Sequence, residues 1–110
     1  MPARLDRAVA NLLDNAAKYS SRVEVRLGAG GELTVRDHGP GIAEADRARV
    51  FDRFYRAAEA RGRPGSGLGL AIVRQVAEGH GGSVAAEAAE GGGALLRLRL
   101  PVVQEIPIYA

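Results

Sequence analysis

Three short clusters in this 110-residue chain could bind a phosphate-bearing ligand, and the first is a glycine run from Gly65 to Leu70. Glycine lets backbone N–H groups approach a ligand closely, and a helix that begins here would add unpaired donors and a partial positive charge. Together these features favour a phosphate site. The same pattern is typical of a plain linker before a helix, so its meaning depends on the other two clusters.

The second cluster lies on the first predicted helix. Asn11 and Asn15 are four residues apart, so both side chains face the same way, and Lys18 and Tyr19 extend this face by one turn. A solvated helix face explains two asparagines poorly, because Asn is a weak helix former unless its side chain has a partner. The alternative is a face lining a polar cavity, in which amide oxygens bind Mg²⁺ and Lys18 neutralises phosphate charge.

The third cluster is Asp37 with the two glycines that follow it, Gly39 and Gly41. Leu33 and Val35 mark the core face of a predicted strand, and Asp37 falls on the same face at the strand end. A buried carboxylate is costly unless it is hydrogen-bonded. It could cap the next turn, or it could accept hydrogen bonds from a ligand at the sheet edge. The glycines favour a ligand, because they let a flat molecule approach the backbone.

Helices and strands must position these clusters. Apolar spacing predicts a helix from about Arg4 to Lys18, and a second from Leu68 to Glu78 with Gly79 at its C′ position. Alternating residues predict a half-buried strand over Arg22–Leu27 and a hairpin partner over Leu33–Asp37. The apolar stripe of the first helix comprises Leu5, Val9, Leu12, Leu13 and Ala16.

Two further short strands are predicted, one over Ser83–Glu87 and one around Leu96, Leu98 and Leu100. Strands on both sides of helices, with hairpin-like pairs, predict an α/β two-layer sandwich. Its sheet is expected to be mixed and mostly antiparallel, packed on about three helices.

The remaining polar and aromatic residues give weaker signals. Residues 44–63 are charged, with short helical pieces expected around Phe51 and Phe54, both docking on the core. Arg56 follows them beside a predicted loop, from which a guanidinium could reach a terminal phosphate. His38 and His80 are separated and no cysteine accompanies them, so both are expected to be structural rather than zinc ligands.

Composition indicates one small globular domain with 46% hydrophobic and 25% charged residues. The net charge of +2 and the lack of a Lys/Arg run do not favour a nucleic-acid surface. The absence of cysteine excludes a disulfide framework and a thiolate metal site. The apolar runs are too short to insert in a membrane, so a cytoplasmic location is expected.

Taken together, four blocks resemble the ATP-binding catalytic domain of bacterial sensor histidine kinases, which has the Bergerat fold. The N box is matched by residues 11–20, the first glycine box by 37–42, the F box by 51–56 and the second glycine box by 65–70. His80, Gly81 and Gly82 follow at the family's usual place. One block alone is weak evidence, but four in the family's order and spacing make the resemblance specific.

The resemblance implies a role for each block. Asp37 hydrogen-bonds the adenine amino group, and Tyr19 packs near the ribose or adenine. Asn15 ligates Mg²⁺, Asn11 supports it or positions a water, and Lys18 contacts the phosphates. The catalytic residues implied are Asn11, Lys18 and Arg56. The implied ATP site also includes Gly39, Gly41, Ile42, Phe54, Gly65, Ser66, Gly67, Leu68, Gly69 and Leu70, and residues 44–66 become the ATP lid.

The chain departs from the family pattern in three respects. The family domain begins with strands before the N-box helix, so the expected catalytic domain, residues 1–101, lacks them, and residues 102–110 form a tail. The helical dimerisation and phosphoacceptor domain is absent, and neither His38 nor His80 lies in the amphipathic helix that an acceptor needs. Where the family often has a Thr that assists adenine binding through water, this chain has Ala94 and Leu95.

The expected function is that of a protein-histidine kinase catalytic domain that uses Mg²⁺ and ATP. It would transfer the γ-phosphoryl group to a histidine on a separate helical domain, upstream of a response regulator, in the cytosolic part of a membrane sensor kinase. One alternative is a non-catalytic ATP-binding regulatory module of the same fold, of the anti-sigma or sensor type. Another is a fragment too incomplete to bind nucleotide.

Overall fold

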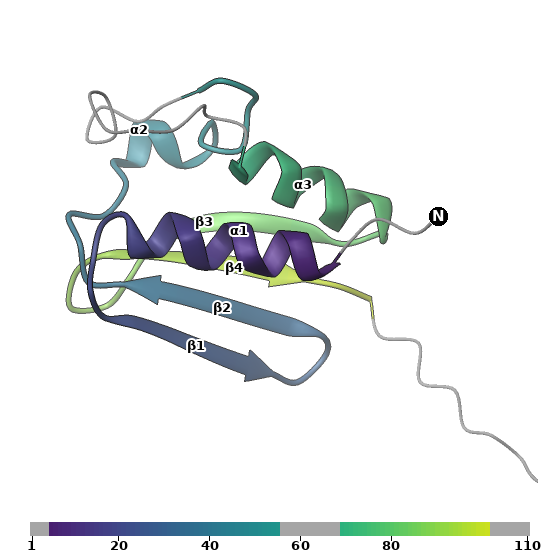
Figure 1. The fold of residues 1–110 in the computed structure, drawn as a ribbon, viewed down its shortest axis with the longest axis horizontal. Coiled ribbons are helices and arrows are strands. Elements are labelled where there is room, and N and C mark those ends of the chain that lie inside the picture. The colour runs from purple at the N-terminus through teal and green to yellow at the C-terminus, as the bar shows by residue number, and fades with distance from the viewer. Residues whose placement is uncertain (1–4, 56–68, 102–110) are drawn as a thin grey trace, which may run out of the picture.

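A four-stranded antiparallel sheet covered on one face by two helices forms the fold (Figure 1). The computed structural model describes residues 5–55 and 69–101. The strand order is β1-β2-β4-β3, and α1 and α3 lie side by side on the same face. The elements are α1 (Leu5–Ala17), β1 (Val23–Gly28), β2 (Glu32–Asp37), α2 (Glu44–Arg47), α3 (Gly69–Gly79), β3 (Ser83–Ala88) and β4 (Ala94–Arg99).

The predicted two-layer α/β sandwich is confirmed. In the described part of the chain every strand pairing is antiparallel, so the sheet contains none of the parallel pairing that a mixed sheet would have. The predicted hairpin is also confirmed, with Val25 opposite Val35 and Glu24 opposite Arg36. None of the described helices is both long enough and apolar enough to cross a membrane.

The buried face of α1 is rotated from the predicted stripe. Leu12 and Ala16 are buried as expected, but Leu5 and Leu13 are 37% and 36% exposed, and Ala8 is buried in their place. Because α1 must contact both α3 and the sheet, its contact face runs along Ala8, Leu12 and Ala16, where the two alanines let the elements approach closely. The core is completed by Val35, Val50, Phe51, Val73, Val76, Ala77, Leu96 and Leu98.

Strand β1 is less buried than its alternating sequence predicts. Val23 is partly buried and packs against the core, but Val25 and Leu27 are 47% and 81% exposed. β1 is the edge strand of the described sheet, and α1 lies over its neighbours rather than over its far end (Figure 1). The predicted half-buried strand is therefore partly buried only at Val23 and Glu24, and the rest of β1 is exposed.

The end of α3 corrects the predicted position of its terminating glycine. The Gly82 N–H donates to the Ala77 carbonyl at 2.8 Å, and the Gly81 N–H donates to the Glu78 carbonyl at 2.9 Å. Gly81 has a φ of 77°, so this is a Schellman motif in which Gly81, not Gly79, occupies C′. His80 lies at the cap, with Nδ1 2.9 Å from the Val76 carbonyl oxygen.

The expectation for Phe54 is wrong, whereas Phe51 docks on the core as predicted. Phe51 is buried, but Phe54 is 63% exposed and has a φ of 66°. The helical piece ends at Arg47, and separate hydrogen-bonded turns follow it, including Tyr55 N–H to the Asp52 carbonyl. This left-handed residue breaks the helical spacing that would have placed both rings on one face.

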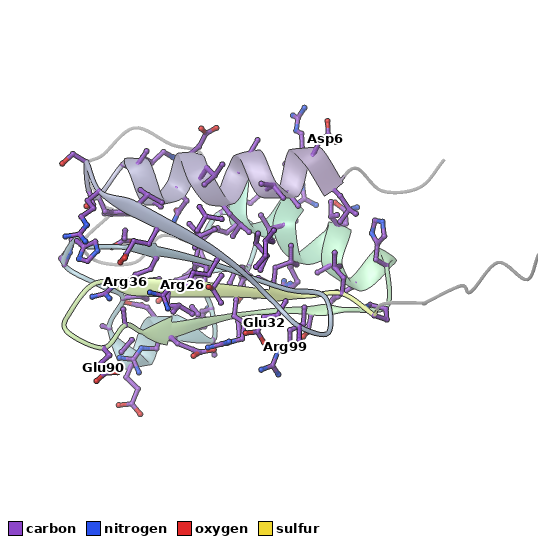
Figure 2. The ribbon with its side chains drawn as sticks, turned by 90° about the horizontal axis from the view of Figure 1, so that it is seen from below. Asp6, Arg26, Glu32, Arg36, Glu90 and Arg99 are labelled. Carbon is purple, nitrogen blue, oxygen red and sulfur yellow. The ribbon has the colours of Figure 1, made fainter. Side chains whose placement is uncertain are left out.

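Charged side chains cover the face of the sheet opposite the helices (Figure 2). Arg97 bonds Glu32 and also Glu87, whose Oε2 lies 2.7 Å from Arg97 Nε, while Arg99 Nε donates to Glu32 at 2.9 Å. The hydrogen bond from Arg99 is the main cause that lowers the pKa of Glu32 below the ordinary carboxyl value. The hydrogen bond from Arg97 is the main cause that lowers the pKa of Glu87. The face is therefore an ordered array of ion pairs across β2, β4 and β3.

Replacing Gly82 with Ala is expected to destabilise the fold by about 1–3 kcal/mol. An added Cβ would lie 2.0 Å from the Arg99 carbonyl oxygen, so the start of β3 would have to move away from β4. Urea unfolding measures the change. Gly28→Ala is the control, because its Cβ would meet Glu32 at an ordinary 3.7 Å, and it should stay within about 0.5 kcal/mol. Equal stability of the two variants would contradict the prediction.

The ion-pair array predicts loss of stability in acid. A carboxyl whose pKa is lowered by folding stabilises the protein fully above its unfolded pKa, about 4.3, and this contribution is lost as the pH falls through the folded pKa. The free energy of unfolding in urea should therefore fall between about pH 5 and pH 3. The double variant Glu32→Gln, Glu87→Gln should show a shallower fall, while Glu90→Gln, an exposed acid on the next turn, should keep the wild-type slope. Identical slopes in all three proteins would contradict this account.

Candidate nucleotide site

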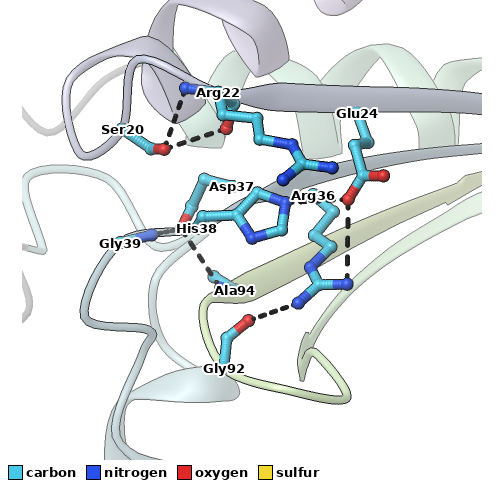
Figure 3. Close-up of polar contacts among 9 residues, drawn as sticks. All are labelled: Ser20, Arg22, Glu24, Arg36, Asp37, His38, Gly39, Gly92 and Ala94. Carbon is cyan, nitrogen blue, oxygen red and sulfur yellow. Dashed lines mark hydrogen bonds and ion pairs between the residues drawn. The ribbon is translucent and has the colours of Figure 1, made fainter.

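Asp37, the last residue of β2, is the buried acid around which the candidate site is built. It is 3% exposed, and its Oδ1 accepts the Gly39 N–H at 2.9 Å and the Ala94 N–H at 3.2 Å (Figure 3). The turn-capping interpretation is thus confirmed. Among the described residues no group hydrogen-bonds Oδ2, so the same carboxylate can also accept a hydrogen bond from a ligand.

The loop after Asp37 packs between α1 and the β3–β4 turn. A Cβ on Gly39 would lie 2.7 Å from the Tyr19 carbonyl oxygen, and Gly41, with a φ of 81°, would place one 3.3 Å from the Gly93 oxygen. Close packing of the backbone therefore explains why glycine stands at both positions, whether or not a ligand binds there. This packing brings Tyr19, Asp37, Gly39 and Gly41 close together.

The asparagine face of α1 points toward the start of α3. The Asn11 amide nitrogen donates to the Gly69 carbonyl at 3.1 Å, which joins the N box to the end of the second glycine box. Asn11, which is half-buried, therefore has a hydrogen-bond partner within the chain. Asn15 lies one turn further along, half-buried, and its amide makes no hydrogen bond to the part of the chain that the structure describes. Lys18 follows the last residue of α1, and its N–H donates to the Asn15 carbonyl at 3.2 Å.

Several predicted site residues are not brought to this site by described contacts. Phe54 lies on an exposed turn, where its ring centroid is 5.4 Å from the Arg53 guanidinium carbon. Ile42 and Leu70 are partly buried against the core. The others lie outside the described residues, and they are Arg56, Gly65, Ser66, Gly67 and Leu68, together with the rest of the predicted lid beyond residue 55.

The β3–β4 turn contributes to the site in a way that the sequence argument missed. Gly93 has a φ of 89°, and a Cβ on it would lie 2.0 Å from the Asp37 carbonyl oxygen. The next residue, Ala94, donates its backbone N–H to the carboxylate. In the sequence, Ala94 is notable only because it stands where the family often has a Thr. The run of glycines at 91–93, all with positive φ, was the available signal for a tight turn here.

A polar network on the outer face of the sheet lies directly behind Asp37. His38 Nε2 is 2.8 Å from Glu24 Oε2, and Arg36 Nη1 is 3.7 Å from the same oxygen (Figure 3). Arg36 Nη2 also donates to the Gly92 carbonyl at 2.9 Å. The hydrogen bond from His38, aided by the charges of His38 and nearby arginines, lowers the pKa of Glu24 against the opposing effect of burial.

Comparisons with known proteins agree with this arrangement. Residues 1–104 match the family described as histidine kinase-, DNA gyrase B-, and HSP90-like ATPase. A "Signal transduction histidine-protein kinase/phosphatase MprB" from Mycobacterium sp. (strain KMS) is 57% identical over 98 residues, which cover 83% of this chain and 19% of the relative. The protein with the same description from Mycobacterium tuberculosis (strain ATCC 25177 / H37Ra) is 52% identical over 98 residues, with the same coverage.

Solved structures show the same relationship. The "Mycobacterial sensor histidine kinase MprB" superposes with a TM-score of 0.74 at 46% identity, covering 86% of this chain and 70% of that one. The ATP-binding domain of PrrB from Mycobacterium tuberculosis gives a TM-score of 0.62 at 33% identity, covering 90% and 64%.

The chain spans about one fifth of the length of the curated relatives that it matches. Its match to the family model covers most of its residues, and its relatives are named as sensor histidine kinases. The chain therefore belongs to the histidine kinase-, DNA gyrase B-, and HSP90-like ATPase family, as an ATP-binding catalytic domain of the sensor histidine kinase type.

Proposed function

We propose that this chain binds ATP with Mg²⁺ and presents its γ-phosphoryl group to a histidine on another domain. The observation that carries the proposal is the Asp37 carboxylate, buried and fixed through Oδ1 by two backbone donors. Fixed in this way, Oδ2 can accept from the amino group of adenine, which is a donor that guanine lacks at the same ring position. Tyr19, whose carbonyl oxygen packs against Gly39, would then border the base.

The α1 face supports a phosphate and metal site next to the base site. Asn11 contacts Gly69, so this part of the N box lies beside the end of the second glycine box, and Asn15 follows one turn later on α1. The Asn15 amide oxygen is a hard donor suited to Mg²⁺, and Lys18 supplies positive charge toward the phosphates. Bound Mg²⁺ would neutralise phosphate charge. Arg56 and the N–H groups of residues 65–70 would complete the phosphate site.

The phosphoryl acceptor in this proposal is a histidine outside the chain. Both histidines of the chain have other partners, since His38 contacts Glu24 and His80 contacts the Val76 carbonyl. The acceptor would lie on a helical dimerisation domain, in the same or a separate polypeptide, and a response regulator would receive the group next. Transfer would depend on positioning and charge neutralisation, in the cytosolic part of a membrane sensor kinase. The relatives give no support to the regulatory-module alternative.

Asp37→Asn is expected to weaken ATP binding by about 10- to 100-fold and to narrow the preference for ATP over GTP. The amide oxygen can still accept the Gly39 and Ala94 N–H groups, but the NH₂ group then stands where the base needs an acceptor. Isothermal titration with MgATP and MgGTP measures both effects. Asp14→Asn, the same change on an exposed part of α1, should bind like the wild type. Unchanged discrimination in Asp37→Asn would refute the adenine assignment.

Phosphoryl transfer is tested by adding a helical phosphoacceptor domain from a relative and γ-labelled ATP. The acceptor should become labelled, with the acid lability and base stability of phosphohistidine. Chelation of Mg²⁺, or Asn15→Ala, should slow labelling by roughly a hundredfold or more. If the wild-type chain binds ATP but labels no acceptor, the regulatory-module alternative is the better description. If it binds no ATP at millimolar concentration, the fragment alternative holds.

A further inference from the structure

The two backbone donors to Asp37 come from segments that are distant in sequence. Gly39 belongs to the loop after β2, and Ala94 is the first residue of β4. Neither segment is fixed by the carboxylate alone, because each is also connected to Glu24 on the opposite face of the sheet. His38 connects the first segment, and Arg36, through the Gly92 carbonyl, connects the second (Figure 3).

The strand register explains why one acid reaches both segments. Successive side chains of a strand alternate between faces, so Arg36 and His38 point to the outer face while Asp37 points to the inner one. Glu24 lies opposite Arg36 in the β1–β2 pair, directly behind the strand that bears Asp37. The side chains of Glu24, His38 and Arg36 are only 30%, 29% and 23% exposed, so solvent competes with these contacts only in part.

Arg36 depends on this arrangement because it has few other partners. Its Nε is buried and forms no hydrogen bond to the described residues. Its guanidinium is therefore held by the Glu24 carboxylate and the Gly92 carbonyl. Without Glu24 the arginine charge would gain more by turning to solvent. The Gly92 carbonyl would then lose its hydrogen bond from Arg36, which adds to the backbone hydrogen bonds between Ala89 and residues 92 and 93 that hold the turn before Ala94.

We propose that Glu24 is a positioning residue for base recognition: through His38 and Arg36 it holds both backbone donors of Asp37, and so sets the orientation of the carboxylate toward adenine. The proposal rests on the proposed function for its nucleotide. Glu24 itself lies on the outer face and touches no ligand. Two other acids of that face differ, since Glu32 and Glu87 pair with Arg97 and Arg99 and connect strands, with no hydrogen bond or ion pair among the described residues to the segments around Asp37.

The test compares Glu24→Ala, Glu24→Gln and Glu32→Ala in the full chain, by titration with ATP, GTP and inorganic tripolyphosphate. Glu24→Ala should bind ATP about threefold to tenfold more weakly, with tripolyphosphate binding unchanged, so the ATP preference narrows. Glu24→Gln should restore most of the affinity, because its amide oxygen can still accept from His38. Glu32→Ala is the matched control. It should lower thermal stability but keep the ratio of ATP to GTP affinity.

Amide hydrogen exchange in the nucleotide-free chain gives an independent readout. The Gly39 and Ala94 amides should exchange about threefold to tenfold faster in Glu24→Ala than in the wild type, and should keep wild-type rates in Glu32→Ala. If Glu24→Ala does not fold, His38→Ala and Arg36→Ala each remove one connection, and each should accelerate exchange at its own donor, Gly39 or Ala94.

The outcomes separate this proposal from the proposed function. A wild-type chain that binds no ATP, but whose Gly39 and Ala94 amides depend on Glu24, would overturn the ATP site and leave the support of Asp37 by Glu24 standing. A wild-type chain that prefers ATP, with the same preference and the same exchange rates in Glu24→Ala, would overturn the positioning role alone. A parallel loss of ATP, GTP and tripolyphosphate binding would also overturn it, because such a loss reflects general unfolding.

Discussion

A carboxylate buried between sheet and helices needs hydrogen-bond donors, and much of this fold is arranged to supply them to Asp37. Leaving an ionised carboxylate uncompensated in such surroundings costs several kcal/mol. Its donors are backbone N–H groups, which are available only if the loop after β2 turns tightly and β4 begins beside the end of β2. Gly39 and Gly93 permit these approaches, because a Cβ at either position would overlap a neighbouring carbonyl oxygen. The tight turn after β2 and the close approach of the start of β4 therefore both serve the hydrogen bonds to this carboxylate.

The two faces of the sheet have different roles: the inner face packs against the helices, and the outer face carries ion pairs. On the inner face, alanines of α1 let the helix approach the sheet and α3 closely, and this places Asn11 within reach of Gly69. On the outer face, ion pairs connect strands, and the network of Glu24, His38 and Arg36 supports the site from behind. Because side chains alternate along β2, Asp37 points to the inner face, where the proposed nucleotide site lies, while its neighbours Arg36 and His38 point to the outer face and contact Glu24.

The sequence predicted features that depend on local period and spacing. The helices, the β1–β2 hairpin and the inward orientation of Asp37 follow from such patterns, and the structure contains them. The rotated face of α1 could not be predicted, because it depends on where α3 packs. The end of α3 was misplaced because Gly79, Gly81 and Gly82 all suit a helix terminus, and only the hydrogen bonds select Gly81. The hydrogen bond from the Ala94 backbone N–H could not be predicted, because any residue except proline can donate one. The pairing of Glu24 with His38 could not be predicted either, because it depends on the register of two strands.

The hydrogen bond between Asp37 and Ala94 joins residues 57 positions apart in the sequence. Contacts of such long sequence separation form late, because a large loop must close first. During synthesis the acid emerges well before its second donor, and for that interval its charge can be satisfied only by Gly39 or by water. The proposed nucleotide site is thus completed only when β4, the last strand in the described sheet, has been synthesised, and recognition of the base would report that the described sheet has assembled.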